Sequence, residues 1–197
     1  MKKIFLSLAI ASITFASCGG DKTEEKKDGE NSEKSVETVA ASEEMQSVNL
    51  EENELPVTMD IPKYFATGMK DPIPYEIIHD EGDYKWKIVI GQEEKIKYCL
   101  TIEDMGEDAT DLVADKKSQL AGDRIWNVNY IVDGAEAILM EKTLTGDDSV
   151  EPQYQVFGTF TADGIKYKVY SDETEAFKKR HAQNMLASIQ SLNKKPA

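Results

Sequence analysis

The sequence predicts an α+β domain over residues 55–193, in which two main helices pack on a largely antiparallel β-sheet. Apolar and polar residues alternate over most of this segment, as they do in strands that bury one face. Two Asp-Gly pairs, Asp133-Gly134 and Asp163-Gly164, separate alternating stretches, and this pair is a strong signal for a hairpin turn. Two other stretches have the period of a helix, and one of them closes the domain.

The expected strands follow one another with turn residues between them. The first is short and lies between Pro56 and Pro62, which places it near an edge because proline cannot donate to the strand ladder. The strands are expected at residues 55–61, 75–79, 84–90, 95–103, 125–132, 135–144, 154–161 and 165–170.

Two helices complete the domain. The first is expected at 108–121, because Asp108 is a suitable N-cap and Gly122 suits the position after the last turn. The second is expected from about 173 to 192, with Ser171 or Asp172 as its cap. Its apolar residues recur on one stripe, as docking on a sheet requires: Phe177, Met185, Ile189 and Leu192.

Residues 1–17 have the pattern of a cleaved signal peptide. Two lysines precede Ile4–Ser17, a charge-free stretch of 14 residues, which is shorter than the ~20 residues that a membrane-spanning helix needs. The sequence Phe15-Ala16-Ser17-Cys18 resembles the lipobox of bacterial lipoproteins, although Leu is the usual residue at the position of Phe15. The resemblance implies that the signal is cut before Cys18 and that this cysteine is diacylated. The alternative is an ordinary secretory signal.

A diacylated Cys18 predicts a lipid-anchored protein of the cell envelope. Two or more acyl chains hold a protein firmly at a membrane, whereas one chain binds marginally. The outer membrane is the expected membrane, with the domain either periplasmic or exposed at the cell surface. The expected partners are the membrane and an unidentified protein or other component of the envelope.

Residues 18–54 are expected to form the lipidated cysteine and a disordered acidic tether. Gly19 to Glu54 contains 12 acidic residues, 4 lysines, and neither aromatic residues nor proline, so it has little apolar surface to bury. Only a weak helical tendency is expected, around Val36–Met45. The tether is interpreted as a plain spacer, with a loose resemblance to the acidic surface-export signals of some Gram-negative lipoproteins as the alternative. Residues 194–197 are expected to form a tail.

The chain is strongly acidic, with 37 Asp and Glu against 23 Lys and Arg and a net charge of −14. This balance argues against a nucleic-acid partner, because affinity for phosphate backbones comes from clustered Lys and Arg. The two cysteines, Cys18 and Cys99, exclude a disulfide-rich scaffold and a cysteine-based zinc cluster.

Six lysines fall on the polar side of three expected strands. One interpretation is a cationic face that binds an anionic ligand or partner surface, which requires the three strands to be neighbours. The other is the ordinary solvated face of an antiparallel sheet, on which lysine also protects edges. The six residues are Lys85, Lys87, Lys95, Lys97, Lys166 and Lys168.

Residues suited to catalysis are few, and the sequence predicts no catalytic residue, metal ligand or cofactor. His79 lies at a hairpin end rich in acids, His181 lies within a helix, and neither belongs to a zinc-protease pattern. Cys99 lies within a strand and is expected to be a packed small residue. The acidic stretches 103–108 and 147–148 lack the spacing of a calcium-binding loop.

Two segments resemble PsbP/Mog1-like domains. Val57-Thr58-Met59-Asp60-Ile61-Pro62-Lys63-Tyr64-Phe65 is similar to the opening strand and Pro-x-x-Phe of that family. Phe177, Ala182 and Met185-Leu186-Ala187-Ser188-Ile189 are similar to its closing helix. The resemblance implies a fold and no activity, since its relatives serve as binding and assembly modules.

These patterns predict a membrane-anchored lipoprotein whose domain is a non-enzymatic binding or assembly module. One alternative is an extracytoplasmic protein that binds a small ligand or a metal. The other is a hydrolase, which would need a polar cluster that converges in a deep pocket.

We expect replacement of Cys18 by Ala to abolish incorporation of a fatty-acid analogue in the native cells, because the sulfur is the predicted attachment point. In-gel detection of the labelled protein measures this, with Cys99→Ala as the control that keeps its label. Equal labelling of the Cys18→Ala variant and the wild type would contradict the anchor.

Overall fold

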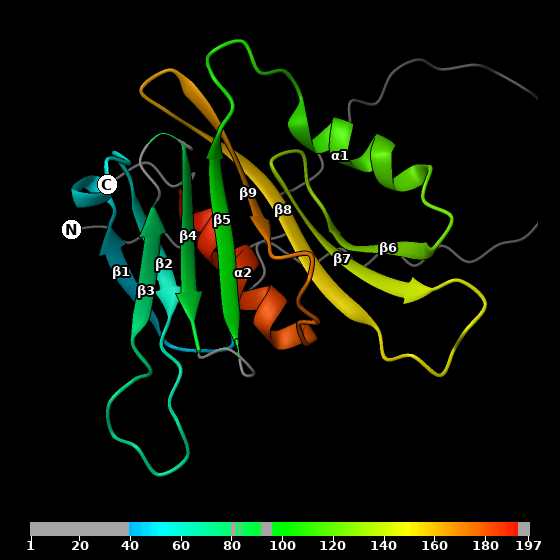
Figure 1. Cartoon of the computed structure of the whole chain (residues 1–197), viewed down its shortest axis with the longest axis horizontal. Coiled ribbons are helices and arrows are strands. Elements are labelled where there is room, and N and C mark those ends of the chain that lie inside the picture. Colours follow the sequence, from blue (N-terminus) through cyan, green and yellow to red (C-terminus); the bar gives the residue numbers. More distant parts are fainter. Residues whose placement is uncertain (1–39, 80–81, 83, 92–95, 193–197) are drawn as a thin grey trace, which may run out of the picture. The chain divides into compact units, whose positions relative to one another are not determined.

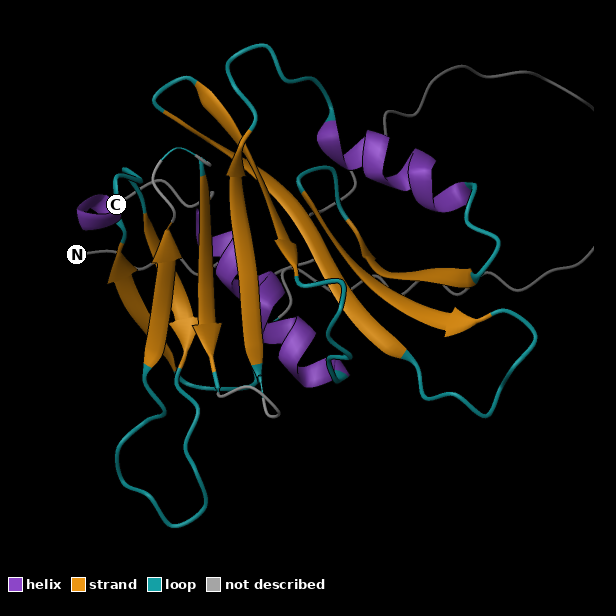
Figure 2. Ribbon diagram, in the orientation of Figure 1, coloured by secondary structure: helices purple, strands orange, loops and turns teal. Residues whose placement is uncertain are grey.

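The computed structural model describes residues 40–79, 82, 84–91 and 96–192 (Figure 1). The predicted signal peptide, Cys18, Lys95 and the tail at 194–197 lie outside the described residues. The predicted α+β class is confirmed, because two α-helices are combined with a large antiparallel sheet (Figure 2).

The large sheet has seven strands in the order β3-β4-β5-β9-β8-β7-β6, and all neighbours are antiparallel. A separate two-stranded sheet is formed by β1 and β2. The elements are β1 (Met45–Asn49), a 3₁₀ turn (Glu51–Asn53), β2 (Thr58–Pro62), β3 (Tyr75–His79), β4 (Lys85–Ile90), β5 (Tyr98–Asp104), α1 (Leu112–Ala121), β6 (Trp126–Asp133), β7 (Ala137–Leu144), β8 (Gln153–Ala162), β9 (Ile165–Ser171) and α2 (Lys179–Leu192).

Helix α2 lies across one face of the large sheet and covers the main hydrophobic core (Figure 2). Met185 and Ile189 lie four residues apart on the same side of this helix, and both are fully buried. They pack in one cluster with strand residues that recur at every second position, such as Ile88 and Ile90 of β4. The amphipathic helix and the alternating strands therefore supply complementary apolar surfaces.

The opposite face of the sheet carries a smaller core under α1. Ile138 and Phe157 alternate in sequence with residues that face α2, so they point to the other side, where they pack against Val113 of α1. Strands β7 and β8 are thus buried on both faces. Within the described residues no helix covers this second face over β4 and β5 (Figure 2).

Gly158 of β8 lies directly under Ile189 of α2. A Cβ atom at this position would lie 2.5 Å from Cγ2 of Ile189 and 3.1 Å from Cβ of Ala137. Real Cβ atoms do not approach other heavy atoms so closely, so only glycine lets Ile189 reach its position over the strand.

The boundary predicted at residue 55 is wrong, because part of the expected disordered tether is folded. β1 pairs with β2 in register from Met45↔Pro62 to Asn49↔Thr58. Val48 and Leu50 are buried in the main core, and Ser42 donates from its backbone N to Oδ1 of Asn184 at 2.8 Å. These few apolar side chains gain enough burial against α2 and β2 to order an otherwise acidic segment.

The predicted starts of both helices are also wrong. α1 begins at Leu112, and its N-cap is Asp111, whose Oδ1 accepts from the backbone N of Ala114 at 3.1 Å. α2 begins at Lys179. Asp172, one of the two expected caps, instead closes a turn by accepting a hydrogen bond from the backbone N of Thr174 at 3.0 Å. Phe177 precedes the helix but is buried in the main core as expected.

We expect Gly158→Ala to lower the free energy of unfolding by about 1–3 kcal/mol, because the added methyl overpacks the contact with Ile189. Urea denaturation measures the change. Gly122→Ala is the matched control and should change stability by less than about 0.5 kcal/mol, since its Cβ would lie 3.6 Å from the nearest atom, the carbonyl oxygen of Gln119. Equal stability of Gly158→Ala and the wild type would contradict the close approach.

Candidate functional site

Strands β4, β5 and β9, which carry the predicted lysine face, are neighbours in the sheet. In the register of the ladder, Lys85 of β4 lies opposite Glu103 of β5, and Glu103 lies opposite Lys168 of β9. Lys87 and Lys166 have the same strand parity and share this face, which is the one opposite α2. Four of the six predicted lysines are therefore brought to one face.

Lys97 does not join them. Its ammonium lies 5.6 Å from the ring centroid of Tyr64, a residue of the main core on the α2 side. The expectation that all six lysines lie on one face is therefore wrong for Lys97, because it precedes the regular part of β5 and strand alternation does not hold there.

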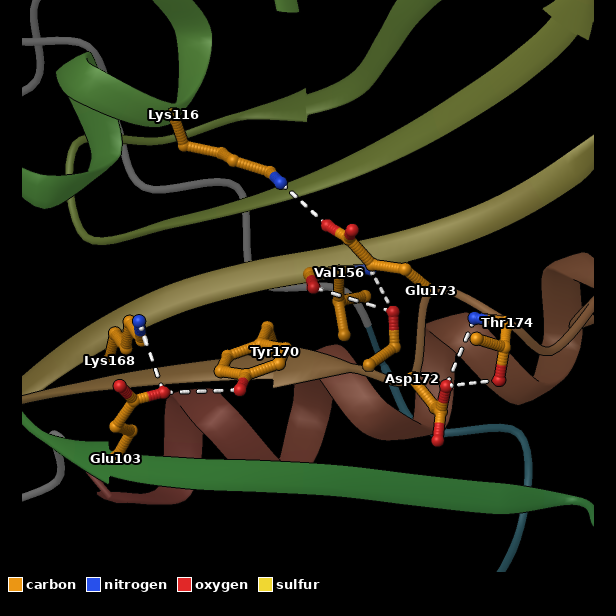
Figure 3. Close-up of polar contacts among 9 residues, drawn as sticks. Glu103, Lys116, Val156, Lys168, Tyr170, Asp172, Glu173 and Thr174 are labelled. Carbon is orange, nitrogen blue, oxygen red and sulfur yellow. Dashed lines mark hydrogen bonds and ion pairs between the residues drawn. The ribbon is translucent and has the colours of Figure 1, made fainter. Parts of the chain in front are cut away.

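Carboxylates of the protein itself pair with three of the four lysines on this face. Oε2 of Glu103 lies 3.1 Å from Nζ of Lys168 and 3.6 Å from Nζ of Lys85, and it accepts a hydrogen bond from the Tyr170 hydroxyl at 3.2 Å (Figure 3). Burial alone would raise the pKa of Glu103, but the hydrogen bond from Lys168 and the two ammonium charges outweigh it and lower the pKa. Glu103 thus lies between Lys85 and Lys168 and pairs with both.

A second ion pair joins β4 to the end of β9. Nζ of Lys87 donates to Oδ2 of Asp172 at 2.9 Å, and Asp172 also accepts from the Thr174 hydroxyl at 2.6 Å. Burial would raise the pKa of Asp172, but these hydrogen bonds lower it to about 2. The remaining lysine of this face, Lys166, donates to the carbonyl oxygen of Thr110 at 2.6 Å and so holds the loop before α1.

A groove lies beside this network, between α1 and strands β8 and β9. Its volume is about 290 Å³. It is lined by residues from the loop after β5, from α1, β8 and β9, and from the segment after β9. These residues are Met105, Leu112, Asp115, Lys116, Gln119, Phe157, Lys168, Tyr170 and Glu173.

The groove combines apolar and aromatic side chains with two partly buried ammonium groups. Nζ of Lys116 lies 6.0 Å from the ring centroid of Phe157, and Nζ of Lys168 lies 5.5 Å from that of Tyr170. Burial, and then the charge of Glu103, raise the pKa of Tyr170 to about 12, so its hydroxyl stays a hydrogen-bond donor near neutral pH.

One ion pair lies across the rim of the groove. Nζ of Lys116 donates to Oε1 of Glu173 at 2.6 Å (Figure 3). The two side chains differ in exposure, because that of Lys116 is 18% exposed and that of Glu173 is 58% exposed. The Lys116 side chain is thus largely buried, whereas the carboxylate of Glu173 is exposed to solvent.

The histidines and Cys99 do not line the groove. The His79 ring stacks on Trp86 with a centroid distance of 4.8 Å. His181 is buried beside Tyr64, and burial together with the nearby charge of Arg180 lowers its pKa to about 4. Cys99 is buried as expected, and burial raises the pKa of its thiol to about 11, which suits a packed residue.

The acidic stretches serve local structure. Oδ1 of Asp104 accepts from the backbone N of Gly106 at 2.7 Å, and Oδ1 of Asp147 accepts from that of Ser149 at 2.9 Å. Among the residues that the structure describes, no group of three or more His, Cys, Asp or Glu could hold a metal ion.

Sequence reasoning missed the groove, although the strands contain a signal for it. Alternation breaks down in the apolar runs of β7 and β8, which include Ile138 and Met140 on one strand and Phe157 on the next. Continuous apolar runs indicate strands that are buried on both faces. They therefore indicate that α1 covers a second face, but they do not give the position of Lys116 or Glu173.

No protein-family model matches the chain, and no curated protein matches it significantly. None of the helices in the described part of the chain is both long and apolar enough to cross a membrane.

We expect Asp172→Asn to lower the free energy of unfolding by about 1 kcal/mol at pH 7, because it removes the charge that Lys87 faces in a partly solvated setting. Asp172 has a folded pKa of about 2, below its ordinary value of 3.8. Its contribution is therefore complete above that ordinary value and disappears as the pH falls through 2.

Urea denaturation of both proteins across this pH range measures the difference, and Asp148→Asn, at an exposed position of the β7–β8 loop, is the control. A loss for Asp172→Asn that is as large at pH 2 as at pH 7 would contradict the role of the carboxylate charge.

Proposed function

We propose that this protein is a lipid-anchored binding protein of the cell envelope, held at the outer membrane through Cys18. The lipobox resemblance at residues 15–18 supports the anchor. The folded domain acts as a non-enzymatic binding module, and the segment between Cys18 and the domain links it to the lipid. Its resemblance to PsbP/Mog1-like domains, which serve as binding modules, agrees with this role.

The groove beside α1 is the observation that carries the proposal. It is concave, and its apolar side chains Met105, Leu112 and Phe157 lie among a few polar groups, which is the usual composition of a small-molecule site. It has a volume of about 290 Å³ and lies between α1 and strands β8 and β9. This favours a small ligand over a large assembly partner as the molecule that the domain binds.

A ligand-binding role also accounts for the chemistry of the groove better than hydrolysis does. Its polar side chains are two lysines, two acids, a glutamine and a tyrosine. The acids Asp115 and Glu173 are exposed, and Glu173 is paired with Lys116, whereas a general acid or base is typically held within hydrogen-bond reach of its substrate inside the site.

We expect the full-length protein, purified in detergent from its native cells, to carry a small molecule in the groove. Gln119 is exposed and lines the groove, so Gln119→Trp should fill the opening and exclude that molecule. The neighbouring Ser118 is also exposed but does not line the groove, so Ser118→Trp is the matched control.

Mass spectrometry of the compounds released on denaturation identifies the ligand. It should be present with the wild type and Ser118→Trp and be depleted by about tenfold or more with Gln119→Trp. The same set of compounds from all three proteins would contradict a ligand site in this groove.

A further inference from the structure

We infer that the groove binds a small carboxylic acid with an apolar, aromatic body, and that Glu173 occupies the carboxylate position when the ligand is absent. This inference rests on the proposed function, because it names the ligand class of the same groove. It follows from the size of the groove, from its aromatic walls and from the unequal way in which its two lysines are held.

The volume and the walls limit the body of the ligand. Drug-sized ligands occupy pockets of about 300–1,000 Å³. A groove of about 290 Å³ therefore has room for one ring with a short side chain. The rings of Phe157 and Tyr170 and the side chains of Leu112 and Met105 line the groove and offer this ring apolar contacts.

The two lysines of the groove differ in how firmly their partners are held. Lys168 pairs with Glu103, which is 20% exposed and is also bound by Lys85 and Tyr170. This carboxylate is fixed by three groups, so an external anion cannot easily replace it. Lys168 is therefore already paired within the ion-pair network of the face opposite α2.

The partner of Lys116, the carboxylate of Glu173, is held less firmly. Among the described residues, Lys116 is the one hydrogen-bond and ion-pair partner shown for the Glu173 carboxylate, and the Glu173 side chain is 58% exposed. An ion pair with one partner in solvent contributes little to stability, so Glu173 can turn away at small cost. The ammonium of Lys116 would then need another anion, because it is 18% exposed and lies over an aromatic ring.

The same geometry disfavours a cationic ligand. The acids of the groove, Asp115 and Glu173, lie on its exposed side, where water screens their charge. The ammonium groups of Lys116 and Lys168 are the more buried charges, at 18% and 25% exposure, so their field is screened less. A negative group attached to an apolar body therefore complements both the charge and the surface of the groove.

The test uses a matched pair of probes, 3-phenylpropionate and its neutral analogue 3-phenylpropionamide, titrated by calorimetry into the full-length protein in detergent. The carboxylate should bind at least about tenfold more tightly than the amide, because only the carboxylate forms a charge-assisted hydrogen bond with Lys116.

Three variants separate the charge of Lys116 from general effects on α1. Lys116→Gln should weaken binding of the carboxylate by about tenfold and leave the amide unchanged. Lys117→Gln is the matched control, because Lys117 is the next residue of α1 and also pairs with an acid, Asp133, but does not line the groove. Glu173→Gln should tighten carboxylate binding by about threefold or more, since the competing charge is removed. A gain in affinity cannot come from a variant that fails to fold.

Equal affinity of the two probes would overturn the carboxylate inference while leaving the groove as a binding site. Unchanged or weaker binding of the carboxylate by Glu173→Gln would overturn the role of Glu173 as an internal competitor. Failure of both probes to bind, with a neutral or cationic compound recovered from the native protein, would overturn the ligand class and leave the proposed function intact.

Discussion

The packing of α2 against one face of the seven-stranded sheet is the interaction on which the rest of the structure depends. It buries the apolar stripe of the helix, and it requires Gly158 to have no side chain, so that Ile189 can lie directly over β8. The β1–β2 pair adds to the same core. This face holds the larger of the two hydrophobic clusters, and the opposite face carries the smaller cluster under the short helix α1.

Charge is distributed with the same asymmetry. The chain has a net charge of −14, yet the face opposite α2 gathers four lysines, three of which pair with Glu103 or Asp172. Despite burial, hydrogen bonds and lysine charges lower the pKa values of Glu103 and Asp172, from Lys168, Tyr170 and Lys85 in the first case and from Lys87 and Thr174 in the second, so this network is part of the fold. The pair of Lys116 and Glu173 lies at the margin of that network, where exposure of the acid lets a ligand compete.

Local patterns predicted most of the fold, because strand alternation and Asp-Gly turns depend on neighbouring residues. Tyr75–His79 has the expected bounds, and most other strands differ from expectation by one to three residues at either end. β1 could not be predicted, since its order depends on burial of Val48 and Leu50 against distant elements in an acidic segment. The groove depends on where α1 lies over β8 and β9, which strand register and long-range packing decide.

A crystal structure of the protein soaked with 3-phenylpropionate tests the central claim most directly. The account predicts that the aromatic ring lies against Phe157 and Tyr170, that the carboxylate accepts a hydrogen bond from Nζ of Lys116, and that Glu173 has turned into solvent. An occupied groove in which Lys116 still binds Glu173, or a ligand bound elsewhere on the domain, would contradict it.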